Sequence, residues 1–194
     1  MTRIVAVLVH PHMAQAAPPG VDPARFLEAV AEDTYEMAAA LDLVTPVLAT
    51  SVPGLDDIVW PGTEVLTIAE NEPLTTTLAR LHADQAAVIC ADAPDLPPLL
   101  VGKLFRELGR AEITVCPAEN GGAVALACGL PAPRWAEPDL DAYDVVKELR
   151  AQAPGPRRVA TTPGWHRLRT PGDLARLDPG LEGWESTRAL IGAR

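Results

Sequence analysis

Apolar residues along the chain fall into short continuous runs that alternate with segments of helical spacing. Residues 3–9, RIVAVLV, form an apolar, β-branched run, which is typical of a strand covered on both faces. Residues 22–42 place apolar side chains near helical spacing behind a capping Asp22 and a Pro23 at the first helical position, which predicts a helix. The same patterns predict strands at residues 44–50, 64–69, 86–91, 112–118, 122–129 and 157–161, and helices at residues 73–82, 97–108, 140–152 and 170–177.

The order of these elements predicts the fold class. Strands separated by helices of ten or more residues favour a mostly parallel sheet with helices on both faces. Segments 112–118 and 122–129 are joined by too few residues for a crossover helix, so they predict an antiparallel excursion. We expect a three-layer α/β/α fold with a mixed, mostly parallel sheet, as one domain over residues 1–194. Residues 179–194 are expected to form a C-terminal helix or tail, and a homodimer that uses this segment is an open alternative.

Composition and charge narrow the classes of partner. The formal net charge is −10, with Lys103 and Lys147 as the lysines, so we expect no nucleic-acid partner, because phosphate backbones need a cationic footprint. The first apolar run is too short for a signal-peptide core or a membrane span, which favours a cytoplasmic protein with no membrane partner. Cys90, Cys116 and Cys128 lie inside apolar stretches without zinc-site spacing, and we expect buried core thiols.

Ligands of open α/β sheets bind outside the carboxyl ends of the strands, and this rule selects the loop after the first strand. His10 and His12 lie in that loop, with Pro11 between them. Because the proline disturbs the spacing and no suitably placed carboxylate follows, a loop wall that faces a ligand is favoured over a two-histidine metal site.

The same rule selects the loop after strand 86–91. Asp92 follows that strand directly, and a carboxylate there can hold a divalent cation that bridges phosphate oxygens. Taken alone, Asp92 is better explained as part of a polar turn that ends the strand. Asp95 precedes two prolines and is expected to cap a helix, as is Asp173 near the end of the chain.

A third candidate loop joins segments 112–118 and 122–129. Gly121 and Gly122 predict a hairpin turn with Asn120 in a left-handed conformation, and this needs no ligand. Paired glycines also allow the backbone to approach a substrate closely, so both interpretations stay open.

The motifs ADAPDLP, CPAENGGAVALA and HRLRTPGDLARL, in this order, resemble a bacterial family with the nucleotide-diphospho-sugar transferase (GT-A) fold. The family is often described as glycosyltransferase-like and is related to the guanylyltransferases that activate phospholactate and the molybdenum cofactor. The matching residues are Asp92, Pro94 and Leu96, then Pro117, Ala118, Gly121 and Gly122, then Thr170, Pro171, Asp173 and Leu174. The resemblance is clearest over residues 87–177. It implies a nucleotidyl- or glycosyltransferase-like protein that binds a nucleoside triphosphate or nucleotide sugar, with Mg²⁺ on Asp92.

Departures from the family pattern change this expectation. The loop of residues 10–26 has no lysine, Asn120 stands where the family has an aspartate, and Arg167 and Arg169 stand at two further aspartates. Lost carboxylates remove the charge that attracts Mg²⁺, and arginines repel it, so we expect altered or lost catalysis.

Two interpretations of these departures stay open. Either the two arginines bind phosphate without a metal, or the fold is a non-catalytic scaffold that binds a protein partner or a small anion. Asp92 is the candidate catalytic and metal-binding residue. The candidate substrate-binding residues are His10, His12, Asn120, Gly121, Gly122, Arg167 and Arg169.

Overall fold

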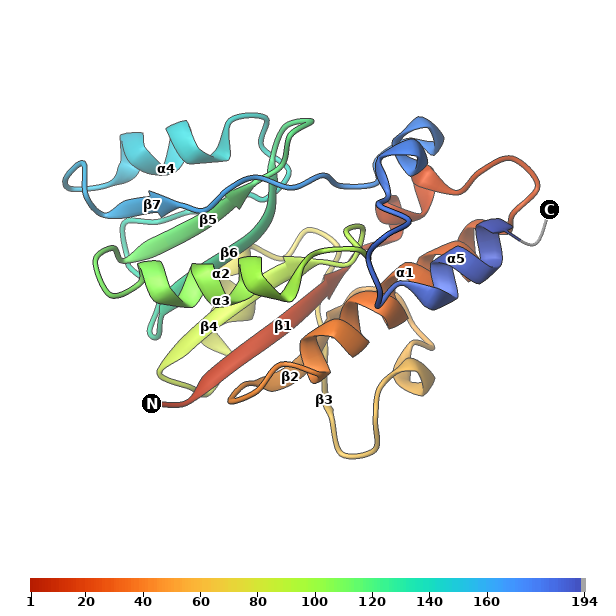
Figure 1. The fold of residues 1–194 in the computed structure, drawn as a ribbon. Helices are drawn as coiled ribbons and strands as arrows, with labels where there is room; N and C mark the ends of the chain where they lie inside the picture. Colours follow the sequence, from red (N-terminus) through yellow and green to blue (C-terminus); the bar gives the residue numbers. More distant parts are fainter. Residues whose placement is uncertain (193–194) are drawn as a thin grey trace.

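A seven-stranded sheet forms the centre of the computed structural model, which describes residues 1–192 (Figure 1). The strand order is β3-β2-β1-β4-β6-β5-β7, and β6 is antiparallel to both of its neighbours whereas the other pairs are parallel. The strands are β1 (Arg3–Val9), β2 (Thr45–Thr50), β3 (Glu64–Thr67), β4 (Gln85–Cys90), β5 (Ile113–Pro117), β6 (Ala123–Gly129) and β7 (Val159–Thr161). The expected mixed, mostly parallel α/β sheet is confirmed.

The helices pack on this sheet as the alternation of patterns predicted. They are α1 (Pro23–Ala39), α2 (Leu74–Ala79), α3 (Pro98–Glu107), α4 (Val145–Gln152) and α5 (Glu185–Gly192), with 3-10 segments η1 (Pro11–Ala16), η2 (Asp56–Ile58) and η3 (Pro171–Arg176). Figure 1 shows α1 and α3 on the near face of the sheet, with α5 alongside α1. Within residues 1–192, no helix combines the length and the apolar character that crossing a membrane requires.

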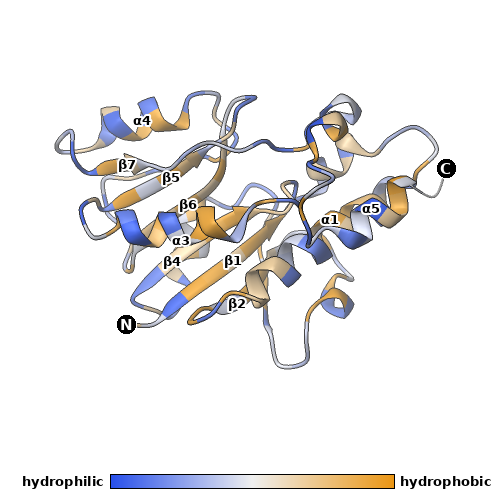
Figure 2. Ribbon diagram, in the orientation of Figure 1, coloured by the Kyte–Doolittle hydropathy of each residue, from blue (hydrophilic) through white to orange (hydrophobic). Residues whose placement is uncertain are grey.

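The core is centred on β1 and β4, the parallel neighbours in the middle of the sheet. Residues 4–9 of β1 are all buried, as are residues 86–90 of β4, and Figure 2 shows both strands as strongly hydrophobic. The three cysteines are free and buried, as expected, and burial raises the pKa of Cys90 and of Cys128 to about 12. These thiols are therefore protonated and unreactive at neutral pH.

Two helix predictions differ from the structure, one at its start and the other in the type of helix. Helix α4 begins at Val145 rather than at residue 140, because Asp144 caps it and the carbonyl of Leu140 instead accepts the amide of Ala123. The predicted helix at residues 170–177 is the 3-10 segment η3, and Asp173 forms the expected cap there through a reciprocal capping box with Thr170.

The expectation that Asp95 caps a helix is wrong. Helix α3 has Pro97 at its N-cap, with no side-chain cap. The buried Asp95 carboxylate instead accepts Trp165 Nε1 at 3.1 Å and the amide of Asp178 at 3.1 Å, and it lies 2.9 Å from His166 Nε2. Asp95 therefore ties the loop after β7 and the C-terminal segment to the end of β4, because a buried carboxylate needs several donors.

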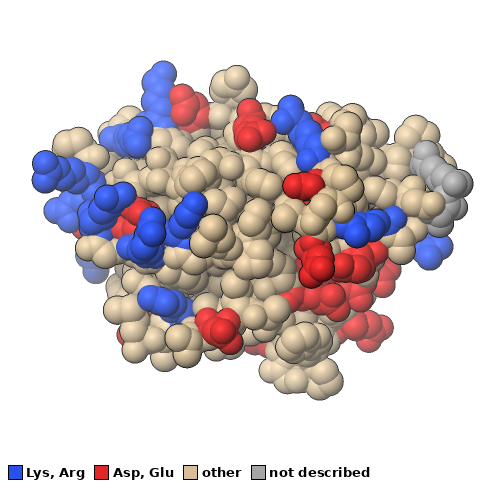
Figure 3. Space-filling view, viewed as in Figure 1, with Lys and Arg blue, Asp and Glu red and all other residues tan. Residues whose placement is uncertain are grey.

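Charged side chains are unevenly distributed over the face seen in Figure 3. Lysines and arginines gather over the end of the sheet that carries α3, β5 and β7, and acidic residues gather near α1. Glu107 and Glu112 pair several of these cations, namely Arg106, Arg110 and Arg158. Arg158 lies at the start of β7, and its main chain bonds the start of β5, so this cationic region borders the sheet edge where those strands begin.

Helix α5 accounts for part of the segment expected to be a C-terminal helix or tail; residues 193–194 lie outside the described part of the chain. Its first turn is capped by Asp33 of α1, a residue 1% exposed whose two carboxylate oxygens accept the amides of Ser186 at 2.9 Å and Thr187 at 2.7 Å. Since the first amides of a helix have no partner within it, Asp33 supplies the acceptors that α5 needs.

We expect Asp33→Ala to lower the free energy of unfolding by about 1–2 kcal/mol, because it removes this cap. Hydrogen exchange should accelerate at Ser186 and Thr187, with much smaller changes in β1. The exposed Glu36→Ala on the same helix is the matched control. Equal exchange at α5 in both variants would contradict the role of Asp33.

Candidate functional site

The loops at the carboxyl ends of β1, β4 and the reversed start of β6 meet at one edge of the sheet. His10 and His12 follow β1, and their rings stack with centroids 5.6 Å apart. His10 Nδ1 lies 3.0 Å from Ser51 Oγ, after β2. Burial, together with the neighbouring His12, lowers the pKa of His10, so His10 is mainly neutral at pH 7.

Asp92, directly after β4, is paired with Arg167 from the loop before η3. Both residues are 1% exposed, and Arg167 Nε donates to the two carboxylate oxygens of Asp92 at 2.8 and 3.1 Å. The carbonyl of Asp92 also accepts a hydrogen bond from the amide of Leu168 at 2.7 Å. This bond fixes the segment of Arg167 to Arg169, which we call the arginine loop, against the end of β4. The ion pair is therefore held from both the side chain and the main chain.

The remaining side of the Arg167 guanidinium faces three further oxygens. Its Nη1 donates to Asp141 Oδ1 at 2.7 Å, to the carbonyl of Leu140 at 3.2 Å and to the carbonyl of Ala123 at 3.3 Å. We call this set, with the two oxygens of Asp92, the oxygen cage. Since Nε and Nη1 are both committed to protein acceptors, these two atoms are not available to a ligand phosphate.

Arg169 lies beside the same cage but is more accessible. Its Nη2 is 3.3 Å from Asp141 Oδ1, its side chain is 30% exposed, and its Nε has no hydrogen-bond partner within residues 1–192. Gly122 makes room for it, because a Cβ there would collide with the Arg169 guanidinium and lie 2.6 Å from the Leu140 carbonyl. Gly122 also has a φ of +79°, which only glycine adopts readily.

The turn before β6 differs from its prediction at Asn120. Its positive φ values belong to Gly121 and Gly122, so the expected left-handed Asn120 is wrong. The Asn120 side chain instead contacts the loop before η3, where its Nδ2 donates to the carbonyl of Arg167 at 3.0 Å. Asn120 makes this bond without a left-handed backbone conformation. The position that the family fills with an aspartate thus stabilises the loop that carries the two arginines.

Two cavities open at this edge of the sheet and share His12 and Asp141, whose Nε2 and Oδ2 atoms lie 3.4 Å apart. The smaller, of about 290 Å³, borders Asp92, Arg167 and Arg169. The larger, of about 750 Å³, lies between the ends of β1 and β3 and the loop before α4. Its acidic lining residues are Glu70, Glu72, Glu137, Asp139 and Asp141.

Sequence reasoning missed Asp141 because the residue lies in a segment with helical spacing. The sequence did offer a signal for Asp141. It is a charged residue next to the apolar Leu140, and it lies four residues before the observed start of α4. The acidic residues after β3 were also missed, although their position after a parallel strand follows the rule that selected the other loops.

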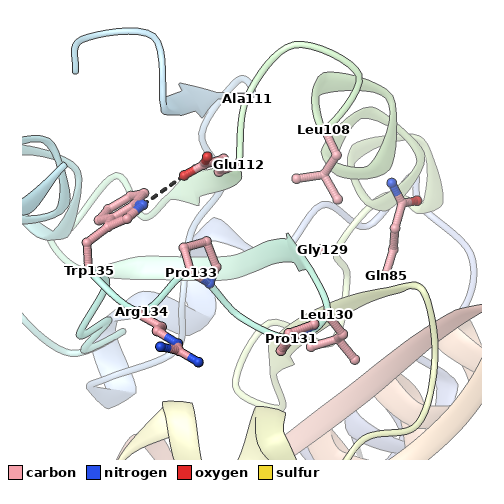
Figure 4. A pocket seen from close by; sticks show the side chains of 10 residues that line it. All are labelled: Gln85, Leu108, Ala111, Glu112, Gly129, Leu130, Pro131, Pro133, Arg134 and Trp135. Atoms are coloured by element: carbon pink, nitrogen blue, oxygen red, sulfur yellow. Dashed lines mark hydrogen bonds between the residues drawn. The ribbon is translucent and has the colours of Figure 1, made fainter. Parts of the chain in front are cut away.

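A further cavity, of about 520 Å³, lies at the opposite edge of the sheet, where β4 begins and β6 ends (Figure 4). Leu108, Leu130 and Pro131 line it, and Trp135 Nε1 points at Glu112 Oε2 at 2.7 Å. Residues of the candidate site do not reach this cavity, so it is separate from the strand ends described above.

The residues present do not fit a divalent cation on Asp92. Both oxygens of Asp92 already accept Arg167 Nε, and a positive guanidinium against the carboxylate repels a second cation. Within residues 1–192, no group of three or more His, Cys, Asp or Glu side chains is arranged to hold a metal ion.

Solved structures similar to this chain share one fold. A protein assigned to the nucleotide-diphospho-sugar transferases from Desulfovibrio desulfuricans G20 has a TM-score of 0.70 at 17% identity, with 100% of this chain and 98% of that chain covered. The 4-diphosphocytidyl-2C-methyl-D-erythritol synthase of Anaerococcus prevotii has a TM-score of 0.62 at 10% identity, over 98% and 96%. Glucosyl-3-phosphoglycerate synthase of Mycobacterium tuberculosis, solved with Mn²⁺ and UDP, has a TM-score of 0.60 at 14% identity, over 99% and 79%.

No protein-family model matches the chain, and a comparison with curated proteins gives no match. At these identities the structural likeness establishes the fold alone. The chain therefore has the fold of the nucleotide-diphospho-sugar transferases, with the mostly parallel mixed sheet that its sequence predicted.

We expect Arg167→Met to lower the free energy of unfolding by about 3–5 kcal/mol, because it leaves buried Asp92 without its counter-charge. The double variant Asp92→Asn, Arg167→Met should lose clearly less than the sum of the single losses. Denaturant titration measures both quantities. Additive losses would contradict a direct coupling between the two side chains.

The charge of Asp141 predicts a pH dependence. Burial acts to raise the pKa of Asp141, but Arg167, His12 and Arg169 outweigh it and hold the pKa below the ordinary value of 3.8. Because the folded state binds this proton less tightly than the unfolded state, the contribution of Asp141 to stability is present above that value. It is lost as the pH falls through the lowered pKa.

We therefore expect Asp141→Asn to flatten the fall in stability as the pH drops below the ordinary aspartate pKa of 3.8. Denaturant midpoints measured against pH test this, with the exposed Asp57→Asn as the control. If the denaturant midpoints of the two variants fall in the same way at low pH, Asp141 does not contribute to the acid dependence of stability.

Proposed function

We propose that this protein binds a nucleotide or nucleotide sugar without a divalent metal, and that it has lost metal-dependent nucleotidyl or glycosyl transfer. One observation carries the proposal: Arg167 is hydrogen-bonded to both oxygens of Asp92, at the strand end where the family resemblance implied Mg²⁺. Nucleotidyl transfer depends on positioning and on neutralising phosphate charge, and the loop after β1 carries no lysine for either purpose.

The two cavities suggest how such a ligand is held. Arg169 borders the smaller cavity with a partly exposed guanidinium, and a guanidinium offers paired donors to phosphate oxygens. The larger cavity offers carboxylates, with Asn71 beside them, as acceptors for the hydroxyl groups of a sugar. His12 stands between the two cavities and would contact the ligand where phosphate and sugar join.

The same charges favour some nucleotides over others. The larger cavity is lined by carboxylates, with no lysine or arginine among its lining residues, so it repels additional phosphate groups. We therefore expect nucleotide sugars and nucleoside diphosphates to bind more tightly than nucleoside triphosphates. The fold neighbours include a UDP complex, which supports a nucleotide as the ligand class.

A non-catalytic scaffold for a protein partner or small anion is the second candidate function. It is favoured by the commitment of Arg167 to protein oxygens, which leaves Arg169 as the accessible guanidinium in the smaller cavity. The chain would then keep the fold and bind its partner through other surfaces.

Calorimetry with a panel of nucleotides and nucleotide sugars tests the proposal, with each ligand measured in EDTA and in Mn²⁺. We expect binding that the metal leaves unchanged and that Arg169→Ala weakens at least about tenfold, because a charge-assisted pair to phosphate is lost. Arg157→Ala, an exposed arginine at the edge where β7 begins, is the matched control. His12→Ala should weaken nucleotide sugars more than nucleoside monophosphates.

Two results would contradict the proposal. Binding that requires Mn²⁺ and disappears in Asp92→Ala would mean that a metal site operates despite Arg167. The absence of binding by every nucleotide tested would favour the scaffold.

A further inference from the structure

The surroundings of Arg167 have the composition of a cation site. Its guanidinium is enclosed by two oxygens of Asp92, one of Asp141 and the carbonyls of Ala123 and Leu140, at distances between 2.7 and 3.3 Å. Carboxylate and carbonyl oxygens are the ligands that Mg²⁺, Mn²⁺ and Ca²⁺ take in proteins. The oxygen cage thus holds the guanidinium of Arg167 in a place whose oxygen ligands would also suit a divalent metal ion.

The charge balance of the oxygen cage also indicates a site that requires a cation. Two carboxylates contribute a formal charge of −2, and Arg167 returns +1 from a position that is 1% exposed. Arg169 approaches Asp141 from outside at 3.3 Å, which brings the cluster close to neutral. The buried Asp92 carboxylate is stable as an anion only with a positive charge beside it, so losing the guanidinium leaves Asp92 in need of another cation.

We propose that Arg167 is a built-in cation that takes the place of a divalent ion in the oxygen cage, and that removing its charge creates a binding site for Mn²⁺. The ligands of the new site are Asp92, Asp141 and the carbonyls of Leu140 and Ala123. Asp141 is 46% exposed at its side chain and can move inward to the shorter distances that a metal requires. This inference uses the same ion pair as the proposed function but requires no nucleotide.

Mn²⁺ alone is the probe, and electron paramagnetic resonance of the free ion, with calorimetry, gives the affinity and stoichiometry. We expect Arg167→Ala to bind one Mn²⁺ at least about tenfold more tightly than the wild-type protein does. Arg167→Lys is the matched control, since it keeps a positive charge inside the cage and should bind no more Mn²⁺ than the wild type. The Mn²⁺ gained should disappear in the double variant Arg167→Ala, Asp92→Asn, and Mg²⁺ or Ca²⁺ should compete for the site.

A second measurement covers the loss of stability expected when the guanidinium is removed. Mn²⁺ should raise the melting temperature of Arg167→Ala and leave that of Arg167→Lys unchanged, because an ion that binds only the folded state stabilises it. Should Arg167→Ala fail to fold, Arg167→Gln retains an amide donor for Asp92 without the charge, and the same gain is expected there in weaker form.

Two outcomes overturn the inference. One is a folded Arg167→Ala or Arg167→Gln that binds Mn²⁺ no better than Arg167→Lys. The other is a wild-type protein whose Mn²⁺ binding is lost in Asp92→Asn, because the guanidinium would then not exclude the ion. Neither outcome depends on whether a nucleotide binds, so they are distinct from a failure of the proposed function.

Discussion

The ion pair between Asp92 and Arg167 is the interaction on which this edge of the sheet depends. Both side chains are 1% exposed, and a charge in such a place persists only with a partner of opposite charge and with its hydrogen bonds made. The guanidinium brings three chain segments together, because its oxygen acceptors come from the end of β4, the start of β6 and the loop before α4. The arginine loop is in turn fixed by Asn120 and by the capping box at η3.

The fold was largely predictable from the sequence, because its signals are local. A continuous apolar run marks β1, a proline and an aspartate mark the start of α1, and a turn too short for a crossover marks the antiparallel β6. Each of these features needs only neighbouring residues and the rules of strand pairing. The start of α4 was predicted wrongly because a contact with a distant segment, the amide of Ala123 on the Leu140 carbonyl, replaces the local pattern there.

The candidate site was predictable only in part, for the same reason. The position of Asp92 at a strand end follows from topology, and the arginines drew attention because they replace expected carboxylates. That Arg167 turns inward and Arg169 stays partly exposed depends on where Asp141 and the carbonyls lie, which a sequence pattern does not encode. Asp95 illustrates the limit: its place before two prolines suits a helix cap, yet donors from the distant residues Trp165 and Asp178 determine its role.

The cap that Asp33 provides for α5 has a consequence for how the chain matures on the ribosome. Asp33 is synthesised before the helix that it caps, because the donors to its carboxylate, the amides of Ser186 and Thr187, lie 153 and 154 residues later. Until those amides are present, the Asp33 carboxylate has no helix end to cap, and the face of α1 that α5 covers has no partner. Closure of that face therefore waits until α5 has been synthesised, so any shorter nascent chain leaves this side of α1 uncovered.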